Sequence, residues 1–265
     1  LKIGYLSPDF RICSAAMMFE TLFEHHPQEN IEIYAYDLLN SGDEAQRYFK
    51  EKIPHWRQLA GLTVEQSCEQ IQNDGLDILM DLAGHTSLSG LAILGRKPAP
   101  VQFSGLTFNG PIGLQSVHRF TDLDCSPNPL MNESLCYLPS WIIIPYQPDI
   151  PGRSAKAIPE QGQNLGCAHH PGRISPQSIS CWAEILKANP TSHLHLKHRL
   201  YESPWCRQYI LEQFKQQGVK AERIHFYVAS PYLDYLKFYQ AMDLILDPFP
   251  YHGGLVSCDA LWMGV

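Results

Sequence analysis

The feature of this chain that most limits its possible folds is a regular alternation of short apolar runs with segments of helical spacing. The apolar runs have the length and composition of buried strands, and they stand at residues 2–6, 31–38, 76–82, 101–106, 165–168, 193–198, 224–228 and 244–246. Segments whose apolar residues recur at helical spacing lie between most of them. Strands that alternate with helices in this way form parallel sheets covered on both faces. The sequence therefore predicts an α/β protein.

Residues that cap helices mark several of the predicted helix starts. Thr63 and Gln66 have the spacing of a capping box. Ser175 precedes Pro176, and proline is favoured at the first position of a helix. Ser14 is expected to cap the helix that follows the first strand.

A proline-rich interval interrupts the alternation and divides the chain. Its prolines stand at 127, 129, 139, 145, 148, 151 and 159, a composition typical of a connector at the surface. We expect a short buried strand inside it, at 141–144. The predicted organisation is a Rossmann-like domain at 1–150, a linker at 151–163 and a second Rossmann-like domain at 164–265, with a cleft between the domains. The chain opens on a strand without Met and stops where a further strand is due, so we interpret it as an excerpt of a longer protein with a truncated C-terminal domain.

Composition excludes several functional classes. The formal net charge is −7 and the Lys and Arg residues form no cluster, which argues against a surface that binds nucleic acid or an acidic membrane. The longest apolar segments are far shorter than the ~20 residues that cross a bilayer. The eight cysteines are scattered without a CxxC pair, and no secretory leader precedes them. We therefore expect free thiols in a soluble, cytoplasmic protein.

The last stretch, LILDPFPYHGGLVSCDALWMGV at 244–265, has the pattern of a strand, a glycine turn and a helix. Two prolines end strand pairing, Gly253 and Gly254 permit unusual backbone angles, and apolar residues resume at helical spacing from Val256. Such a turn presents unpaired backbone N–H groups at the positive end of a helix, where a phosphate or diphosphate can bind. Asp259, about one turn into the helix, is placed to accept hydrogen bonds from a ribose hydroxyl. A plain strand-to-helix turn is the alternative interpretation, because many such turns carry two glycines.

Three further loops follow predicted strands, and ligands of open parallel sheets bind at this edge. They contain the segments SPDFRICS after the first strand, DLAGHT at 81–86 and CAHHPGRIS at 167–175. His193, His195 and His198 have a spacing that resembles a metal site, but strand alternation places the first two on one face and the third on the other. We interpret them as a polar strand face and predict no metal site.

Several blocks of sequence follow one another along nearly the whole chain, namely LKIGYLSPDF, LDILMDLAGHT, RKPAPVQ, LCYLPS, ISPQSISCWAEILKANP and LDPFPYHGGLVSCDALWMGV. Together they resemble the catalytic region of the O-linked N-acetylglucosaminyltransferases, glycosyltransferase family 41, in its bacterial form. The resemblance implies a GT-B fold of two Rossmann-like domains and inverting transfer of N-acetylglucosamine from UDP-GlcNAc to Ser or Thr hydroxyls of proteins. It also implies a nucleotide sugar and a protein or peptide acceptor as partners, no required metal or other cofactor, and a TPR array elsewhere in the full-length chain.

The resemblance assigns roles to residues that would hold the donor. Arg173 stands where the family has a lysine that neutralises the diphosphate; arginine can do this with bidentate geometry but cannot act as a proton source. Gly253 and Gly254 keep the turn, and its backbone N–H donors remain. Leu255 and Val256 replace neighbouring threonines, so the hydroxyl donors are absent. Asp259 is retained for the ribose.

Other matched positions depart from the family or lie on the acceptor side. His170 stands where the family has Asn or Gln, and Tyr235 replaces a histidine that lies against the nucleobase, where an aromatic ring can keep a stacking role. Cys13 replaces a histidine on the acceptor side, and a thiol of pKa near ~8.5 is a poorer base at neutral pH than an imidazole near ~6.5. In the DLAGHT block we expect His85 to contact the acceptor or the sugar; a histidine that satisfies turn backbone is the alternative. The candidate catalytic residues are Arg173, Asp81, His85 and Cys13.

Two functional hypotheses from different classes follow. The first is an active transferase that uses UDP-GlcNAc, or another donor such as the GDP-fucose used by a plant branch of the family. The second is a catalytically impaired member that serves as a nucleotide-sugar-binding or protein-interaction module. The substitutions at Cys13, Arg173, Leu255 and Val256 are what keep the second hypothesis open.

Overall fold

The computed structural model describes residues 1–27, 29–108, 110–123, 133–140 and 162–265. The chain divides into two compact units, Leu1–Tyr146 and Gln147–Val265, and each is described by itself. The predicted strand at 141–144 lies outside the described residues, as does nearly all of the linker predicted for 151–163, so both stay predictions.

The first unit is built on a seven-stranded parallel sheet in the order β3-β2-β1-β4-β5-β6-β7. Its strands are β1 (Lys2–Ser7), β2 (Glu32–Asp37), β3 (His55–Gln58), β4 (Ile78–Asp81), β5 (Val101–Ser104), β6 (His118–Thr121) and β7 (Ser134–Tyr137). The order reverses between β1 and β4, which pair directly. The loops that follow these two strands therefore meet at the carboxyl edge of the sheet, where a doubly wound fold binds ligands.

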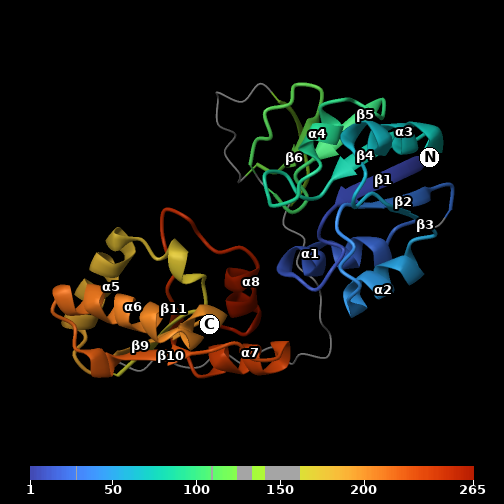
Figure 1. The fold of residues 1–265 in the computed structure, drawn as a ribbon. Coiled ribbons are helices and arrows are strands. Elements are labelled where there is room, and N and C mark those ends of the chain that lie inside the picture. Colours follow the sequence, from blue (N-terminus) through green and yellow to red (C-terminus); the bar gives the residue numbers. More distant parts are fainter. Residues whose placement is uncertain (28, 109, 124–132, 141–161) are drawn as a thin grey trace. The chain divides into compact units, whose positions relative to one another are not determined.

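Helices cover both faces of this sheet, as the sequence predicted (Figure 1). They are α1 (Ser14–Glu24) and α2 (Glu44–Lys52) on one face, and α3 (Val64–Asp74) and α4 (Leu91–Leu94) on the other. Successive residues of β1 point to opposite faces, so Tyr5 enters the cluster under α1 and α2 while Leu6 enters the cluster under α3 and α4. A strand buried on both faces needs apolar residues at every position, which explains the continuous apolar runs.

The predicted caps are confirmed at two helices and wrong at one. Thr63 and Gln66 make both bonds of the capping box at α3. Ser175 accepts a hydrogen bond from the backbone N–H of Ser178, with Pro176 as the first helical residue. At α1 the cap position is Cys13, in extended conformation with φ −162°, and its side chain makes no capping bond. Ser14 already has helical geometry, so its hydroxyl cannot act as the cap.

The second unit is built on a four-stranded parallel sheet in the order β10-β9-β8-β11. Its strands are β8 (Asn164–Cys167), β9 (His193–Lys197), β10 (Ile224–Tyr227) and β11 (Leu244–Ile245). Its α-helices are α5 (Pro176–Ala188), α6 (Pro204–Gln216), α7 (Tyr232–Gln240) and α8 (Leu255–Trp262), with short 3-10 turns η1 (Pro171–Arg173), η2 (Arg199–Glu202) and η3 (Ala221–Arg223). The strand order reverses between β8 and β11, which pair directly.

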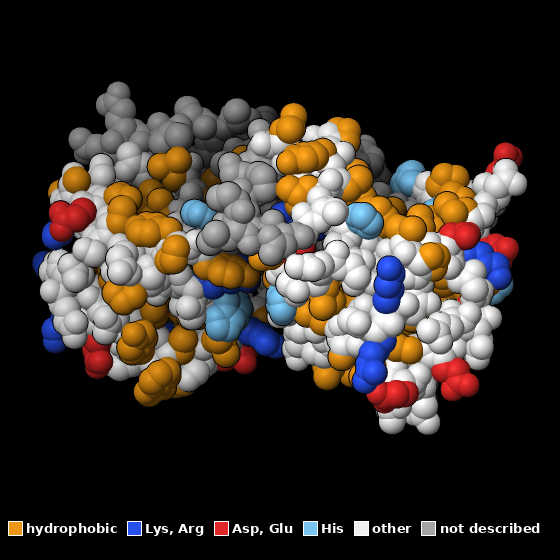
Figure 2. All heavy atoms as spheres, turned by 90° about the horizontal axis from the view of Figure 1, so that it is seen from above, with side chains coloured by type: hydrophobic (Ala, Val, Ile, Leu, Met, Phe, Trp, Pro, Cys, Tyr) orange, Lys and Arg blue, Asp and Glu red, His pale blue; other side chains and the backbone are white. Residues whose placement is uncertain are grey.

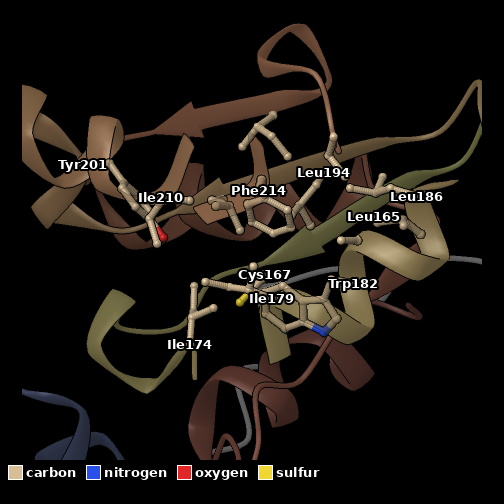
Figure 3. Packing of buried hydrophobic residues seen from close by; sticks show 14 residues of the cluster. Leu165, Cys167, Ile174, Ile179, Trp182, Leu186, Leu194, Tyr201, Ile210 and Phe214 are labelled. Carbon is tan, nitrogen blue, oxygen red and sulfur yellow. The ribbon is translucent and has the colours of Figure 1, made fainter. Parts of the chain in front are cut away.

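The core of the second unit lies between the sheet and the helices α5 and α6. Figure 3 shows Trp182 of α5 and Phe214 of α6 packed with Leu194 of β9 in this cluster. A second cluster, under α7 and α8, covers the other face. Leu244 of β11 is 42% exposed, whereas the sequence predicted a buried strand. The difference arises because β11 lies at the edge of the sheet among the described strands and pairs there with β8 alone.

Two further findings concern the surface. None of the helices in the described ranges combines the length and apolar character that a bilayer crossing requires. On the face shown in Figure 2, Lys and Arg side chains lie scattered among acidic and apolar groups. This pattern differs from the clustered basic residues of a nucleic-acid-binding face.

Candidate functional site

The most closely connected candidate site lies at the carboxyl edge of β8 and β11 in the second unit. The loop after β8 and the loop after β11 are joined by polar contacts along their length. Ser175 donates to the carbonyl of Phe249 at 2.6 Å, and Arg173 Nη1 lies 3.5 Å from the carbonyl oxygen of His252. Two loops that come from adjacent strands at the point of order reversal form the place where open α/β sheets bind ligands.

Arg173 places a cation at this edge of the sheet, and its role toward a diphosphate stays a prediction. It ends the turn η1 and is half-buried. Its guanidinium carbon lies 4.2 Å from the centre of the Tyr251 ring, which belongs to the loop after β11. A guanidinium stacked on an aromatic face keeps its N–H donors directed sideways, and such stacking restricts the side chain before any ligand binds. Arg173 is therefore already positioned in the free site.

The strand, glycine turn and helix predicted for the last stretch are confirmed, with α8 starting one residue before the predicted start. Gly254 occupies the cap position, and no side chain caps the helix. The backbone N–H groups of Ser257 and Cys258 bond to the carbonyl of Gly254, both at 3.1 Å. Leu255 and Val256 come before these two residues in the helix, so their N–H groups lie at its positive end, where an anion is the natural partner.

The reason for glycine at 253 differs from the predicted one. Neither Gly253 nor Gly254 has a positive φ. A Cβ atom at Gly253 would stand 2.1 Å from Ser257 Oγ and 2.3 Å from His169 Nε2, so this position is glycine because other groups approach its backbone closely. A Cβ atom at Gly254 would meet open space, and the backbone there has the uncommon dihedral angles φ −121° and ψ −103°. Only the second glycine therefore supports the predicted role in backbone geometry.

Asp259 lies about one turn into α8 and is 7% exposed. Its Oδ1 accepts a hydrogen bond from the Tyr232 hydroxyl at 2.9 Å. Burial raises the pKa of its carboxyl to about 6, and hydrogen bonds from Tyr232 and Tyr235 oppose that rise. A carboxylate that is buried and only partly compensated is suited to accept further hydrogen bonds, such as those of a diol.

Tyr235, the position predicted to stack on a nucleobase, packs against other tyrosines. Its ring centre lies 5.9 Å from that of Tyr232 in a stacked arrangement and 5.3 Å from that of Tyr239 in an edge-on arrangement. Its hydroxyl meets that of Tyr239, which in turn donates to the carbonyl of Val256 at 3.0 Å. These contacts anchor α8 to α7, and contact with a base stays a prediction.

His170 is exposed on the loop after β8, and its Nδ1 accepts the N–H of Gly172 at 3.0 Å. Its ring centre lies 4.9 Å from that of His198, which follows β9. Burial is the main cause that lowers the pKa of His198 to about 4, and His170, Arg199 and Arg173 lower it further. At neutral pH the His198 ring is therefore uncharged.

The histidines of β9 form part of a polar strand face, as predicted. His195 and His225 stack at 4.8 Å, and His193 Nδ1 lies 2.9 Å from His225 Nε2. Within the described part of the chain, no three His, Cys, Asp or Glu side chains gather in a way that could hold a metal ion.

In the first unit, the predicted Asp81 and His85 lie on the turn after β4. Asp81 is fully buried, and it accepts hydrogen bonds from the backbone N–H groups of Ala83 and Gly84 and from the Ser104 hydroxyl, at 3.2, 2.8 and 3.0 Å. A side chain without exposed surface holds the turn and cannot reach a substrate, so the geometry gives Asp81 a positioning role in place of a directly catalytic one. His85 is exposed at the end of this turn.

Cys13 lies on the loop that follows β1, and β1 pairs with β4 in the sheet. Its Sγ lies 3.7 Å from the carbonyl oxygen of Asp9. Burial is the main cause that raises the pKa of this thiol. At neutral pH the group is a neutral thiol, so the structure does not favour Cys13 as a general base.

Three residues of the second-unit site were missed from the sequence: His169, Asp247 and Tyr232. His169 is completely buried, with Nε2 2.8 Å from Asp247 Oδ1. Asp247 lies two residues after β11 and Tyr232 is the first residue of α7, positions at which polar groups reach the ligand edge. These positions in the sequence could have pointed to both residues. The contact between His169 and Asp247 could not be predicted in this way, because it depends on β8 and β11 being neighbours in the sheet.

Comparison with known proteins agrees with this geometry. The model of "Glycosyl transferase family 41" matches residues 1–164. The chain is 30% identical over 285 residues to the "Probable UDP-N-acetylglucosamine--peptide N-acetylglucosaminyltransferase SPINDLY" of Solanum lycopersicum, covering 100% of this chain and 30% of that protein. The chain thus spans less than a third of the length of this curated relative.

Among solved structures, a mutant of the Thermobaculum terrenum O-GlcNAc transferase superposes with a TM-score of 0.91 at 31% identity, covering 100% of this chain and 51% of that one. Anabaena HepE in complex with UDP and glucose covers 100% of this chain and 79% of its own, with a TM-score of 0.56 at 11% identity, which shows the fold alone. The fold is therefore GT-B, with a parallel sheet in each unit. From the match over residues 1–164 and these likenesses over its full length, this chain belongs to glycosyl transferase family 41.

Proposed function

We propose that this chain is the catalytic region of a protein O-glycosyltransferase that transfers N-acetylglucosamine from UDP-GlcNAc to Ser or Thr hydroxyls with inversion. The observation that carries the proposal is the pairing of a positioned cation, Arg173, with the uncapped N-terminal end of α8 on adjoining loops. A diphosphate needs both kinds of partner. The tomato relative is named a probable UDP-N-acetylglucosamine–peptide N-acetylglucosaminyltransferase and the Thermobaculum terrenum protein an O-GlcNAc transferase, and these names support transfer of N-acetylglucosamine to a peptide.

The chemistry that these groups would assist is displacement at the anomeric carbon. The acceptor oxygen forms a bond to that carbon while the bond between the carbon and the β-phosphate oxygen breaks, and UDP leaves with the electron pair. Negative charge therefore grows on the diphosphate, and the Arg173 guanidinium and the N–H groups of Leu255 and Val256 would stabilise it. Stabilisation of developing charge by groups that are already in place is commonly the largest catalytic contribution.

We assign the ribose to Asp259. Its carboxylate must be ionised to accept hydrogen bonds from two hydroxyls, and at pH 7 a pKa of about 6 leaves most of it ionised. Tyr232 occupies one oxygen atom, Oδ1, in the free site. Donor binding would therefore share or displace this bond. His170, Gly253 and Gly254 complete the proposed donor contacts, and Tyr235 remains the candidate neighbour of the base.

On the acceptor side we propose His85 as the residue that meets the incoming hydroxyl, with Asp81 holding its turn. The acceptor proton must leave during the reaction, and an exposed imidazole is a suitable base near neutral pH. Cys13, whose thiol stays protonated, would contact the substrate without taking the proton. The proposal requires no metal ion or other cofactor, because Arg173 and the helix end supply the positive charge.

The wider setting is also proposed. We infer a protein or peptide acceptor, and a TPR array elsewhere in the full-length chain. We place the protein in the cytoplasm, because all seven cysteines within the described ranges are free thiols, as expected of a reducing compartment.

The test is calorimetric titration of the full-length protein with UDP. Wild-type protein should bind, and Arg173→Ala should lower the affinity at least tenfold, because a bidentate charged contact contributes about 1.5–3 kcal/mol. Arg47→Ala, which removes the same charge from an exposed position on α2, is the matched control and should bind as wild type. Absence of heat or of thermal protection with UDP in the wild type would refute donor binding.

A second candidate function is a nucleotide-sugar-binding or interaction module without turnover. Leu255 and Val256 at the helix end favour it, because their side chains offer no hydroxyl to the diphosphate, and so does the protonated thiol at Cys13. Incubation with labelled UDP-GlcNAc and candidate acceptor proteins separates the two functions. Transfer that is lost in His85→Ala and Arg173→Ala supports the enzyme, whereas UDP binding without transfer to any acceptor supports the module.

A further inference from the structure

A buried histidine links three segments of the donor edge. His169, two residues beyond β8, has a side chain with 0% exposure. Its Nδ1 lies 3.5 Å from Cys167 Sγ, and its Nε2 lies 2.8 Å from Asp247 Oδ1 on the loop after β11. The same carboxylate accepts the Ser257 hydroxyl, at 3.0 Å to Oδ1 and 3.2 Å to Oδ2. Ser257 lies in the first turn of α8, so a continuous polar chain runs from β8 to the helix end.

The glycine turn packs directly on this chain. A Cβ atom at Gly253 would lie 2.3 Å from His169 Nε2, closer than a real side-chain carbon can stand, and 3.1 Å from Asp247 Oδ1, which is a tight contact. The backbone of the turn therefore rests against the imidazole. Any movement of the His169 ring would be transmitted to the segment that carries the N–H groups of the helix end.

The hydrogen positions follow from the partners. A carboxylate can only accept, so the proton of the neutral His169 ring lies on Nε2, and Nδ1 is free to accept the Cys167 S–H. Burial lowers the pKa of His169; Asp247 opposes this change and Arg173 adds to it. Burial raises the pKa of the Cys167 thiol to about 12, so the S–H donor persists.

The contact between His169 and Asp247 is not a completed hydrogen bond in the free site. The two atoms are at hydrogen-bond distance, yet the Nε2–H lacks the alignment of a hydrogen bond, and Nε2 has no hydrogen-bond partner among the residues that the structure describes. At 2.8 Å the separation is short enough that a small shift of either group would align the N–H with the carboxylate. A buried donor that lacks an aligned acceptor requires an explanation, and functional sites are where such groups occur.

We propose that His169 is a positioning residue of the diphosphate site, which acts by holding Asp247 and, through it, Ser257 and the glycine turn. The inference rests on the proposed function, since the turn is the segment that would bind the donor phosphates. Small adjustment of the turn on donor binding would align the N–H of His169 with Asp247. His169 itself, with no exposed surface, does not touch the donor.

Two substitutions separate this role from simple packing. In His169→Gln the amide nitrogen reaches the place of Nε2 and can still donate to Asp247, whereas in His169→Asn the shorter side chain reaches only the place of Nδ1. In calorimetric titration of the full-length protein with UDP, we expect His169→Asn to lower the affinity about tenfold, as loss of a hydrogen bond to a charged group does. We expect His169→Gln to retain affinity within about threefold of wild type.

A measurement without ligand keeps the inference independent of donor identity. Hydrogen exchange of the amides at 253–258 should be about tenfold faster in His169→Asn than in wild type and near wild type in His169→Gln. Equal behaviour of the two variants in exchange, or an Asn variant that exchanges and binds like wild type, would overturn the positioning role. If the wild-type protein fails to bind UDP, the proposed function fails, and the exchange comparison still decides whether His169 holds the turn.

Discussion

Replacing Asp259 by Asn should stabilise the folded protein at pH 7.5 and at the same time remove its affinity for UDP. Asp259 is 7% exposed, and Tyr232 donates to it at 2.9 Å. Burial raises the pKa of its carboxyl from the ordinary 3.8 to about 6, against the opposing effect of hydrogen bonds from Tyr232 and Tyr235. The ionised carboxylate is therefore held in a less favourable environment in the folded protein than in the unfolded chain.

The sign of the effect on stability follows from proton linkage. Because the folded state has the higher pKa, it binds the proton of Asp259 more tightly than the unfolded chain does. Below pH 3.8 the group is protonated in both states, and its full contribution to stability is present. As the pH rises from 3.8 through 6, that contribution is lost. The two pKa values are separated by about 2 pH units, which corresponds to about 3 kcal/mol at roughly 1.36 kcal/mol per unit.

Urea denaturation of wild type and Asp259→Asn between pH 4 and 8 measures this difference. The Asn amide is neutral and its oxygen can accept from Tyr232, so the gain should be about 3 kcal/mol at pH 7.5 and close to zero at pH 4. Asp234→Asn, which removes the same charge from an exposed position on α7, is the control. The hydrogen bond and charge of Lys237 lower the pKa of Asp234, so this change should give no gain in stability. A gain of equal size at both pH values, or no gain at pH 7.5, would refute the account of Asp259.

Three further outcomes are expected. Tyr251→Leu should weaken UDP binding two- to fivefold by releasing Arg173, since an exposed cation–π contact contributes about 0.5–1 kcal/mol; titration calorimetry checks it. Gly253→Ala should lower the free energy of unfolding by about 1–3 kcal/mol, measured by urea denaturation, because its Cβ would overlap neighbouring atoms. Leu255→Thr combined with Val256→Thr should raise UDP affinity about tenfold by adding two hydroxyl donors, and unchanged affinity would show that the diphosphate does not reach the helix end.

Much of the fold could be predicted because its signals are local. The capping box of Thr63 and Gln66 and the proline after Ser175 depend on residues within one helical turn. The strands that the sequence did not predict are β3, β6 and β7, and they lack such local signals. β3 has the sequence HWRQ and is half-buried at the sheet edge, and β6 has the sequence HRFT. Neither segment shows apolar alternation. Whether such a segment forms a strand depends on the neighbouring strand that supplies its hydrogen bonds, and the local sequence does not reveal that neighbour.

In the candidate site, too, the residues of contiguous motifs could be predicted, and the contacts that depend on strand adjacency could not. Arg173, Gly253 and the helix end belong to contiguous motifs, and the structure brings them together as expected. The pairing of His169 with Asp247 depends on the adjacency of β8 and β11, two strands separated by two other strands in the sequence. Burial was equally invisible in the sequence, which is why Asp81 was expected at the substrate and lies beneath the turn.

The departures from the family weigh differently on binding and on turnover. If the diphosphate binds as proposed, the absence of two hydroxyl donors at Leu255 and Val256 lowers donor affinity by about 1–3 kcal/mol in total, because each net hydrogen bond contributes about 0.5–1.5 kcal/mol. The Arg173 guanidinium and the backbone N–H groups remain, so the part of the site that must stabilise negative charge is present. Burial raises the pKa of the Cys13 thiol, so under the proposed function the exposed His85 would take the acceptor proton in its place. Under the proposed function, turnover therefore depends on the first unit and donor binding on the second.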